Sequence, residues 1–187
     1  MSKDLANIIG YGADASGVWV APKGTTAPVG LAAPASGFKE AGWLSEDGVA
    51  FGRSEDKKVF KAHQGGKIVK RMTASVDDTF KFQCLETNAV VLGLRFKGAT
   101  QTKTGTVPDE IVTINVTGQT LNDERAWVVD EAGDDGSTTR YIIPNGVAES
   151  TADLVYKTDE MTVYEFTVGI NGDYTIVTDA PGVVTPA

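Results

Sequence analysis

A two-residue alternation over residues 67–84 (KIVKRMTASVDDTFKFQC) is the feature that most limits how this chain can fold. Its even-numbered positions are mostly apolar: Ile68, Met72, Ala74, Val76, Phe80, Phe82 and Cys84. The odd-numbered positions between them are mostly polar. Because side chains alternate between the faces of a β-strand, the pattern predicts strand structure with one buried face. The parity does not change at Asp77 and Asp78, so either a turn of odd length lies there or one strand runs through with a bend.

Residues 85–98 change to a helical period, and strands resume after them. The positions that share one helical face are Leu85, Ala89, Leu92 and Phe96, with Thr87 or Asn88 as the cap and Gly98 as the end. In residues 110–118 we expect Val112, Ile114 and Val116 to point inward. Residues 126–144 predict a hairpin whose turn lies at 134–136, and a further turn is predicted at residues 144–146. Three further strands are predicted at residues 153–157, 161–169 and 173–179. The predicted fold class is mainly β, a β-sandwich or flattened barrel with one flanking short α-helix.

Three segments are expected along the chain. Residues 1–40 are rich in Gly, Ala, Pro and Thr and carry too little apolar surface to fold alone, so we expect an extended N-terminal arm. This arm is either a disordered tail or a segment that becomes ordered on a neighbour, with Trp19 as its anchor. Residues 41–180 form the main domain, and residues 181–187 a short extended C-terminal tail.

The composition argues against most kinds of chemistry. A net charge of −8 does not suit a protein whose main task is to grip DNA. The single cysteine, Cys84, and the single histidine, His63, leave no disulfide, no Cys-based zinc site and no multi-histidine metal site. We expect Cys84 in the core and His63 at the surface, and we predict no catalytic residue, no metal and no cofactor. No signal peptide or membrane span is recognised, so a cytoplasm-like setting is expected.

Charge is distributed unevenly along the chain. Residues 53–71 hold seven Lys and Arg residues against two acids, a local balance of +5. Residues 121–136 hold six acids against one arginine, a local balance of −5. Opposite patches on one chain suit copies that stack head to tail, and solvated loops that differ by chance are the alternative. The acids at 130–135 could also bind calcium weakly, although they lack the EF-hand spacing.

Several blocks of sequence, in a fixed order, resemble one protein family. They are VWVAPKGTTAP, GWLSEDGV, FKAHQGGKIVKRMTAS, TFKFQCLETN, RYIIPNG and LVYKTDEMTVYEFTV. Together they resemble the major tail tube proteins of long-tailed (siphovirus-type) bacteriophages, particularly those of actinobacterial hosts. The resemblance implies a tube fold of the kind seen in contractile tails and type VI secretion, and subunits that form hexameric rings stacked into a hollow tube. It also implies a place in the virion after assembly in the host cytoplasm, no membrane, and phage DNA that passes without specific binding. The expected partners are other copies of the chain and the tape-measure, tail terminator and distal tail proteins.

The resemblance also implies which residues meet neighbouring subunits. Residues 42–66 would form a long loop or hairpin that reaches another subunit, and the arm would add Trp19. The expected interface residues of this loop are Trp43, Leu44 and Phe51 as apolar anchors and Lys57, Lys58, Lys61, His63 and Gln64 as the polar rim. The expected lumen residues are the polar strand positions Thr73, Ser75, Asp77, Thr79, Thr113, Asn115 and Thr117. They could equally be plain solvent-facing strand residues.

The alternative to a tube subunit is a binding module. A tail-tip or decoration module that binds a host surface glycan would display aromatic side chains on an exposed loop. Only Trp127 and Tyr141 could serve in that way. A hydrolase lacks any recognisable set of catalytic residues.

Overall fold

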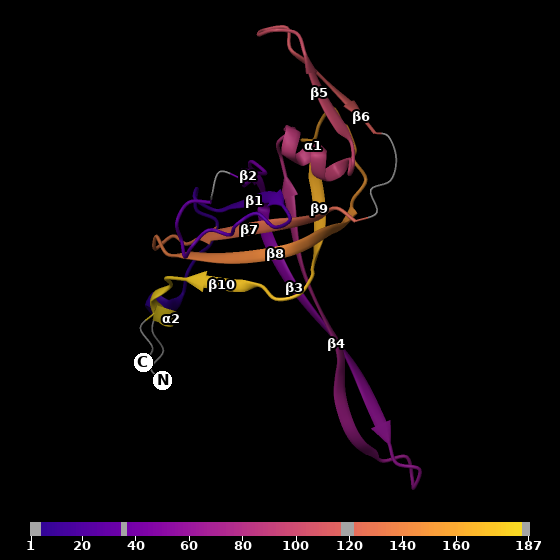
Figure 1. Ribbon diagram of the computed structural model, residues 1–187. Coiled ribbons are helices and arrows are strands. Elements are labelled where there is room, and N and C mark those ends of the chain that lie inside the picture. Colours follow the sequence, from indigo (N-terminus) through magenta and orange to yellow (C-terminus); the bar gives the residue numbers. More distant parts are fainter. Residues whose placement is uncertain (1–4, 35–36, 117–121, 185–187) are drawn as a thin grey trace.

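The structure, a computed structural model, describes residues 5–34, 37–116 and 122–184 (Figure 1). Its elements, in chain order, are η1 (Leu5–Asn7), β1 (Gly17–Pro22), β2 (Lys39–Glu40), β3 (Leu44–Lys61), β4 (Ile68–Cys84), α1 (Ala89–Arg95), β5 (Thr100–Thr104), β6 (Ile111–Asn115), β7 (Glu124–Ala132), β8 (Thr138–Thr151), β9 (Tyr164–Ile170), β10 (Thr175–Thr178) and α2 (Pro181–Val184). None of these helices is long and apolar enough to cross a membrane.

Eight of the strands form one antiparallel sheet. Their order is β2-β1-β7-β8-β9-β4-β3, and β10 pairs with β8 beside this path. β5 and β6 form a separate two-stranded sheet. The prediction of a mainly β fold with a flanking short helix is confirmed.

The long strand β8 joins two layers of this sheet. Its first part pairs with β10 and its last part pairs with β9, and the two groups of strands cross in Figure 1. The turn predicted at residues 144–146 is therefore wrong, because β8 continues through it. Gly146 is needed there, since a Cβ atom on it would lie 2.9 Å from Cδ1 of Trp127. The Trp127 indole packs directly against this backbone and donates a hydrogen bond to the Gly146 carbonyl oxygen at 3.1 Å.

The core lies where the two layers face each other. Phe80 and Phe82 of β4 meet the edge of Trp127 from β7, with ring centroids 5.5 and 6.0 Å apart, and Phe82 stacks on Phe166 of β9. Cys84 is buried in the same cluster, as predicted, and burial raises the pKa of its thiol to about 12, with a smaller contribution from the Glu86 carboxylate. The core therefore uses the even-numbered positions of β4, but only from Phe80 onward.

The alternation at residues 67–84 belongs to a single strand. β4 runs through Asp77 and Asp78 without a turn, and the turn lies at residues 62–67 instead. There the Ala62 amide donates to the Lys67 carbonyl oxygen, and Gly65 and Gly66 adopt positive φ angles of 71° and 65°. Glycine takes this left-handed conformation at no steric cost, which is why GG closes the hairpin.

The helix α1 begins and ends inside the predicted range, but a different face is buried. Asn88 is its cap, since its side-chain oxygen accepts from the amides of Val90 and Val91 at 3.0 and 2.9 Å. Val91 and Leu94 are the buried side chains, whereas Ala89 is exposed. The predicted face holds only in part: Leu92 packs half-buried on the core, but Leu85 and Phe96 lie outside the helix, which spans only residues 89–95.

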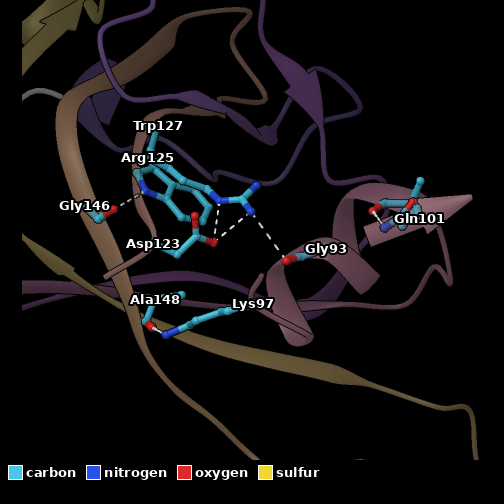
Figure 2. Close-up of polar contacts among 9 residues, drawn as sticks. Gly93, Lys97, Gln101, Asp123, Arg125, Trp127, Gly146 and Ala148 are labelled. Carbon is cyan, nitrogen blue, oxygen red and sulfur yellow. Dashed lines mark hydrogen bonds and ion pairs between the residues drawn. The ribbon is translucent and has the colours of Figure 1, made fainter. Parts of the chain in front are cut away.

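Polar contacts at both ends of α1 fix it beside β7 and β8 (Figure 2). Arg125 of β7 donates to Asp123 at 2.8 Å and to the carbonyl oxygen of Gly93 in the helix. Lys97, just after the helix, donates to the carbonyl oxygen of Ala148 in β8. Gln101 of β5 donates to the carbonyl oxygen of Ala89 at 2.9 Å, which ties the small β5–β6 sheet to the helix.

Part of the predicted N-terminal arm is a strand of the main sheet. β1 pairs with β7 along its whole length, and Val18 and Val20 enter the core. Trp19 alternates to the other side and packs, half-buried, on Ala21, Phe38, Ala126 and Val128. The expectation of an extended arm is thus corrected for residues 17–22, because their period-two pattern buries one face against β7.

A buried ion pair holds the loop after β1. Arg140 of β8 binds both carboxylate oxygens of Asp130 at 2.6 Å, and the two side chains are 3% and 7% exposed. The same guanidinium donates to the carbonyl oxygens of Gly30 and Ala32. Residues 28–32 are therefore fastened to the sheet by one arginine.

Three smaller expectations differ from the structure. Val112 and Val116 are exposed, because β5 and β6 pair only with each other among the described strands. Residues 153–157 are not a strand. In the predicted extended tail, residues 181–184 form α2, and the remainder lies outside the described residues.

Candidate self-assembly surface

The outer part of β3 and β4 leaves the body of the molecule as an isolated hairpin (Figure 1). We call residues 53–77 the distal hairpin. Nearer the body, Phe51 and Phe80 stack inside the sheet, with ring centroids 5.7 Å apart. Every residue of the distal hairpin except Ala62 is exposed. It carries six large apolar side chains that are 39–65% exposed: Val59, Phe60, Ile68, Val69, Met72 and Val76.

So much exposed apolar surface on a two-stranded projection indicates a binding surface, since isolated hairpins are at best marginally stable in water. A register shift between Asp56 and Lys57 also twists the hairpin away from the plane of the sheet.

The basic residues of the distal hairpin are only partly neutralised within it. Arg53 lies 3.7 Å from Asp78, and Lys57 lies 3.5 Å from Glu55. Lys58 lies over the ring of Phe60, 5.5 Å from its centroid. Four further cations have no carboxylate partner in the described part of the chain: Lys61, Lys67, Lys70 and Arg71.

The expected interface residues fall into two environments. Lys57, Lys58, Lys61, His63 and Gln64 are all exposed on the distal hairpin or its tip. Of the expected apolar anchors, only Trp43 is exposed, at 69%. Leu44 and Phe51 are half-buried against the core, and Phe51 also stacks on Tyr141 at 3.9 Å. Trp19 is likewise half-buried in its own subunit.

The expected lumen residues are not on one surface. On β4, Ser75, Asp77 and Thr79 pair with even-numbered residues of β3, whereas Thr73 pairs with the odd-numbered Lys57. The register shift therefore moves Thr73 to the opposite face. Thr113 and Asn115 are exposed on β6, which Figure 1 shows at the other end of the molecule from the distal hairpin, and Thr117 lies outside the described residues.

A cavity of about 850 Å³ lies beside the start of β3. Four stretches of chain form it: residues 11–16, residues 40–49, the segment with Glu86 and Asn88, and Glu131 of β7. Its lining includes six carboxylates (Asp14, Glu40, Glu46, Asp47, Glu86 and Glu131) and, among the described residues, no Lys, Arg or His. We call this feature the acidic cavity. Trp43 also lines it.

The acidic side chains of the cavity differ in their hydrogen-bond partners. Glu86 accepts the Trp43 amide at 2.9 Å. One oxygen of Glu131 is buried without a hydrogen-bond partner among the described residues, as is the hydroxyl of Ser45. Burial, with the nearby Asp130 carboxylate, raises the pKa of Glu131. No group of three or more potential ligands in the described part of the chain is close enough to hold a metal ion.

Three of the six acids at residues 121–136 are paired with cations inside the subunit. Glu124 binds Lys23 at 2.7 Å, Asp123 binds Arg125, and Asp130 binds Arg140. The hairpin predicted at residues 134–136 is present, and Asp134 and Asp135 there accept hydrogen bonds from Gly10 and Ser137. The expected negative patch is therefore reduced to Glu131, Asp134 and Asp135, which have no cationic partner within the described residues. Sequence reasoning missed the acidic cavity because its residues come from four separate stretches.

The fold buries, wholly or in part, the two aromatic side chains that the glycan-binding alternative requires on the surface. Trp127 is fully buried, and Tyr141 is half-buried beneath Phe51. Neither side chain stands on an exposed loop.

Comparison with known proteins gives one family model, and the solved structures that match include two distant ones. The family model described as phage tail tube protein matches residues 4–171. A chain of the anti-feeding prophage (AFP) baseplate, seen by cryo-electron microscopy, is 12% identical with a TM-score of 0.49, over 95% of this chain and 97% of that one. A chain of the PVC sheath-tube complex, an extracellular contractile injection system in its extended state, is 10% identical with a TM-score of 0.45, over 96% and 99%. No curated protein matches the chain. Because the family model covers most of its length, the chain belongs to the phage tail tube proteins, which are structural components of the virion and not enzymes.

Proposed function

We propose that this chain is the major tail tube subunit of a long-tailed, siphovirus-type phage, assembled in the host cytoplasm into stacked hexameric rings. The observation that carries the proposal is the distal hairpin, whose apolar residues are exposed in the single subunit. Within the described residues, the outer edge of β3 also has no strand paired to it. A ring of copies would cover both features, because closing a sheet on itself removes its exposed edges.

In this proposal residues 42–66 are the inter-subunit segment of the 41–180 tube domain, and the tape-measure, tail terminator and distal tail proteins are the further partners. Trp43 is its exposed anchor, and the lysines of the distal hairpin form its charged rim. A bulky side chain that is exposed in the free subunit and buried in the assembly is the usual form of an interface anchor.

The lumen is proposed to lie along the polar outer face of β4 and β9. Thr79, Lys81 and Gln83 on β4 pair there with residues 165–169 of β9, where Glu165 and Thr167 continue the polar surface. Ser75 and Asp77 extend the same face. A polar wall on a subunit of net charge −8 does not hold DNA, because wall carboxylates and phosphates repel each other, so the genome passes without specific binding.

Negative-stain microscopy of the purified protein tests the proposal. Rings or tubes of uniform bore are expected. Monomers that bind host surface glycans would instead support the tail-tip or decoration module.

Salt dependence gives a second test. The Lys57→Glu/Lys58→Glu variant is expected to assemble less than the wild type at low salt in light scattering, and the difference should shrink at high salt because exposed charges are screened. Equal assembly of both proteins at low salt would remove the role of the hairpin charges.

A further inference from the structure

The acidic cavity has carboxylates that the subunit itself does not use. Asp14, Glu40, Glu46 and Asp47 make no ion pair within the described residues, although they line one cavity. Carboxylates gathered around one cavity give it a negative potential, which attracts a cation.

Two buried polar atoms in the cavity wall also indicate a missing partner. The unpartnered oxygen of Glu131 and the unpartnered hydroxyl of Ser45 are both shielded from solvent. A buried polar atom without a partner is destabilising, and because Ser45 and Glu131 are only partly buried residues, either side chain can turn toward the cavity and accept from an N–H donor there. Lysine and arginine carry several such donors on a long stem.

The cavity also has an aromatic side chain suited to a cation. Trp43 is 69% exposed and lines the cavity among the carboxylates. Indole is the ring that binds lysine or arginine best through its face, and the carboxylates supply the charge. The wall is thus complementary to a cationic, partly apolar segment.

This same chain carries such a segment at the opposite end of β3. Residues 44–49 of β3 line the cavity, whereas the strand ends at Lys61 beside the hairpin tip. At about 3.3 Å per residue the two lie on the order of 50 Å apart, so a hairpin cannot reach the cavity of its own subunit. Lys61, Lys67, Lys70 and Arg71 lie near that tip without carboxylate partners in the described chain.

We propose that the acidic cavity of one subunit receives the basic tip of the distal hairpin of a second copy. A donor and an acceptor on opposite ends of one strand make a heterologous contact, which propagates from copy to copy. The inference rests on the proposed tube assembly and names the acceptor site within it. Charge complementarity selects the hairpin of an identical chain as the occupant.

Site-directed cross-linking tests the contact directly. Cys84 is buried, so the thiols of a Gln64→Cys/Asp47→Cys chain are the accessible ones. After assembly and treatment with a short bismaleimide, this variant should give a ladder of covalent oligomers, and each single variant should give none. Gln64→Cys/Asp159→Cys, with the second thiol on an exposed loop away from the cavity, is the matched control. Tubes that form normally without a ladder would overturn the docking and leave the tube function intact.

Charge reversal supplies an independent readout. Glu46→Lys/Asp47→Lys in the cavity and Lys61→Glu/Lys67→Glu on the hairpin should each raise the concentration needed for tubes about tenfold. Combining all four changes in one chain should bring it back to within about threefold of wild type, because the charges again match. Asp159→Lys/Asp173→Lys changes the net charge equally, away from the cavity, and should assemble nearly as wild type. A combined variant no better than the cavity variant overturns the docking, provided that both unfold at the wild-type temperature. A wild-type protein that forms neither rings nor tubes overturns the proposed function itself.

Discussion

Replacing Arg140 by methionine should be among the most damaging single changes in this chain. The guanidinium neutralises Asp130 through two 2.6 Å contacts, with both side chains almost wholly buried. Methionine fills a similar volume but leaves the carboxylate buried without a counter-ion. It also leaves the carbonyl oxygens of Gly30 and Ala32 without their donor.

The magnitude follows from the burial. Removing one partner of a buried ion pair costs about 3–5 kcal/mol, because the remaining charge stays out of water. A domain is stable by only about 5–15 kcal/mol, so this is a large share of the total. With a urea dependence of about 2 kcal/mol per molar, the unfolding midpoint should fall by roughly 2 M.

Urea unfolding of dilute, unassembled protein, followed by tryptophan fluorescence, measures this change. Asp130→Leu/Arg140→Met is the matched control, since it removes both charges. It should recover most of the loss and keep a deficit of about 1–2 kcal/mol from the unpaired loop carbonyls. If Arg140→Met lowers stability by less than about 1 kcal/mol, or the double variant is no better, the buried pair does not hold residues 28–32 to the sheet as argued.

Three further predictions concern single side chains. Trp127→Phe removes the bond to Gly146 and part of the core and should cost about 2–3 kcal/mol in urea unfolding, whereas Trp43→Phe should leave unfolding within about 0.5 kcal/mol and weaken only assembly. Asn88→Ala should cost about 1 kcal/mol by removing the cap of α1, with thermal unfolding as the measurement. The folded state raises the pKa of Cys84 from 9.0 to about 12, so its stabilising effect is complete below pH 9 and is lost as pH rises toward 12. Between pH 9 and 11 the wild type should therefore lose stability faster than Cys84→Ala, by up to about 1 kcal/mol per pH unit, and parallel curves would contradict this.

Local pattern accounts for much of the fold. The alternation at residues 67–84 predicted the long strand β4, and Asn88 was correctly among the predicted caps of the helix, although the helix ends at Arg95, before the predicted Gly98. The fold class and the family followed from strands of this kind and from ordered sequence blocks. These features succeed because each depends on residues that are neighbours in the chain.

The predictions for individual residues failed where a distant segment of the chain decides the environment of the residue. Residues 144–146 have the composition of a turn, yet β8 bends through them because the indole of Trp127 packs on Gly146. The even-numbered side chains of β4 are buried at Phe80 and exposed at Val76, although both follow the same period. The pattern specifies which side chains share a face, but not whether another layer covers that face.

The same division applies to the assembly surface. The sequence by itself determined that the chain is β-rich and carries a concentrated basic segment, since composition and period are local properties. Only the tertiary structure decided which charges remain available: it pairs three of the six acids of residues 121–136 with cations and gathers carboxylates from four stretches around one cavity. The physical reason is that electrostatic and packing energies depend on distance in space, which the folded sheet sets between residues far apart in the chain.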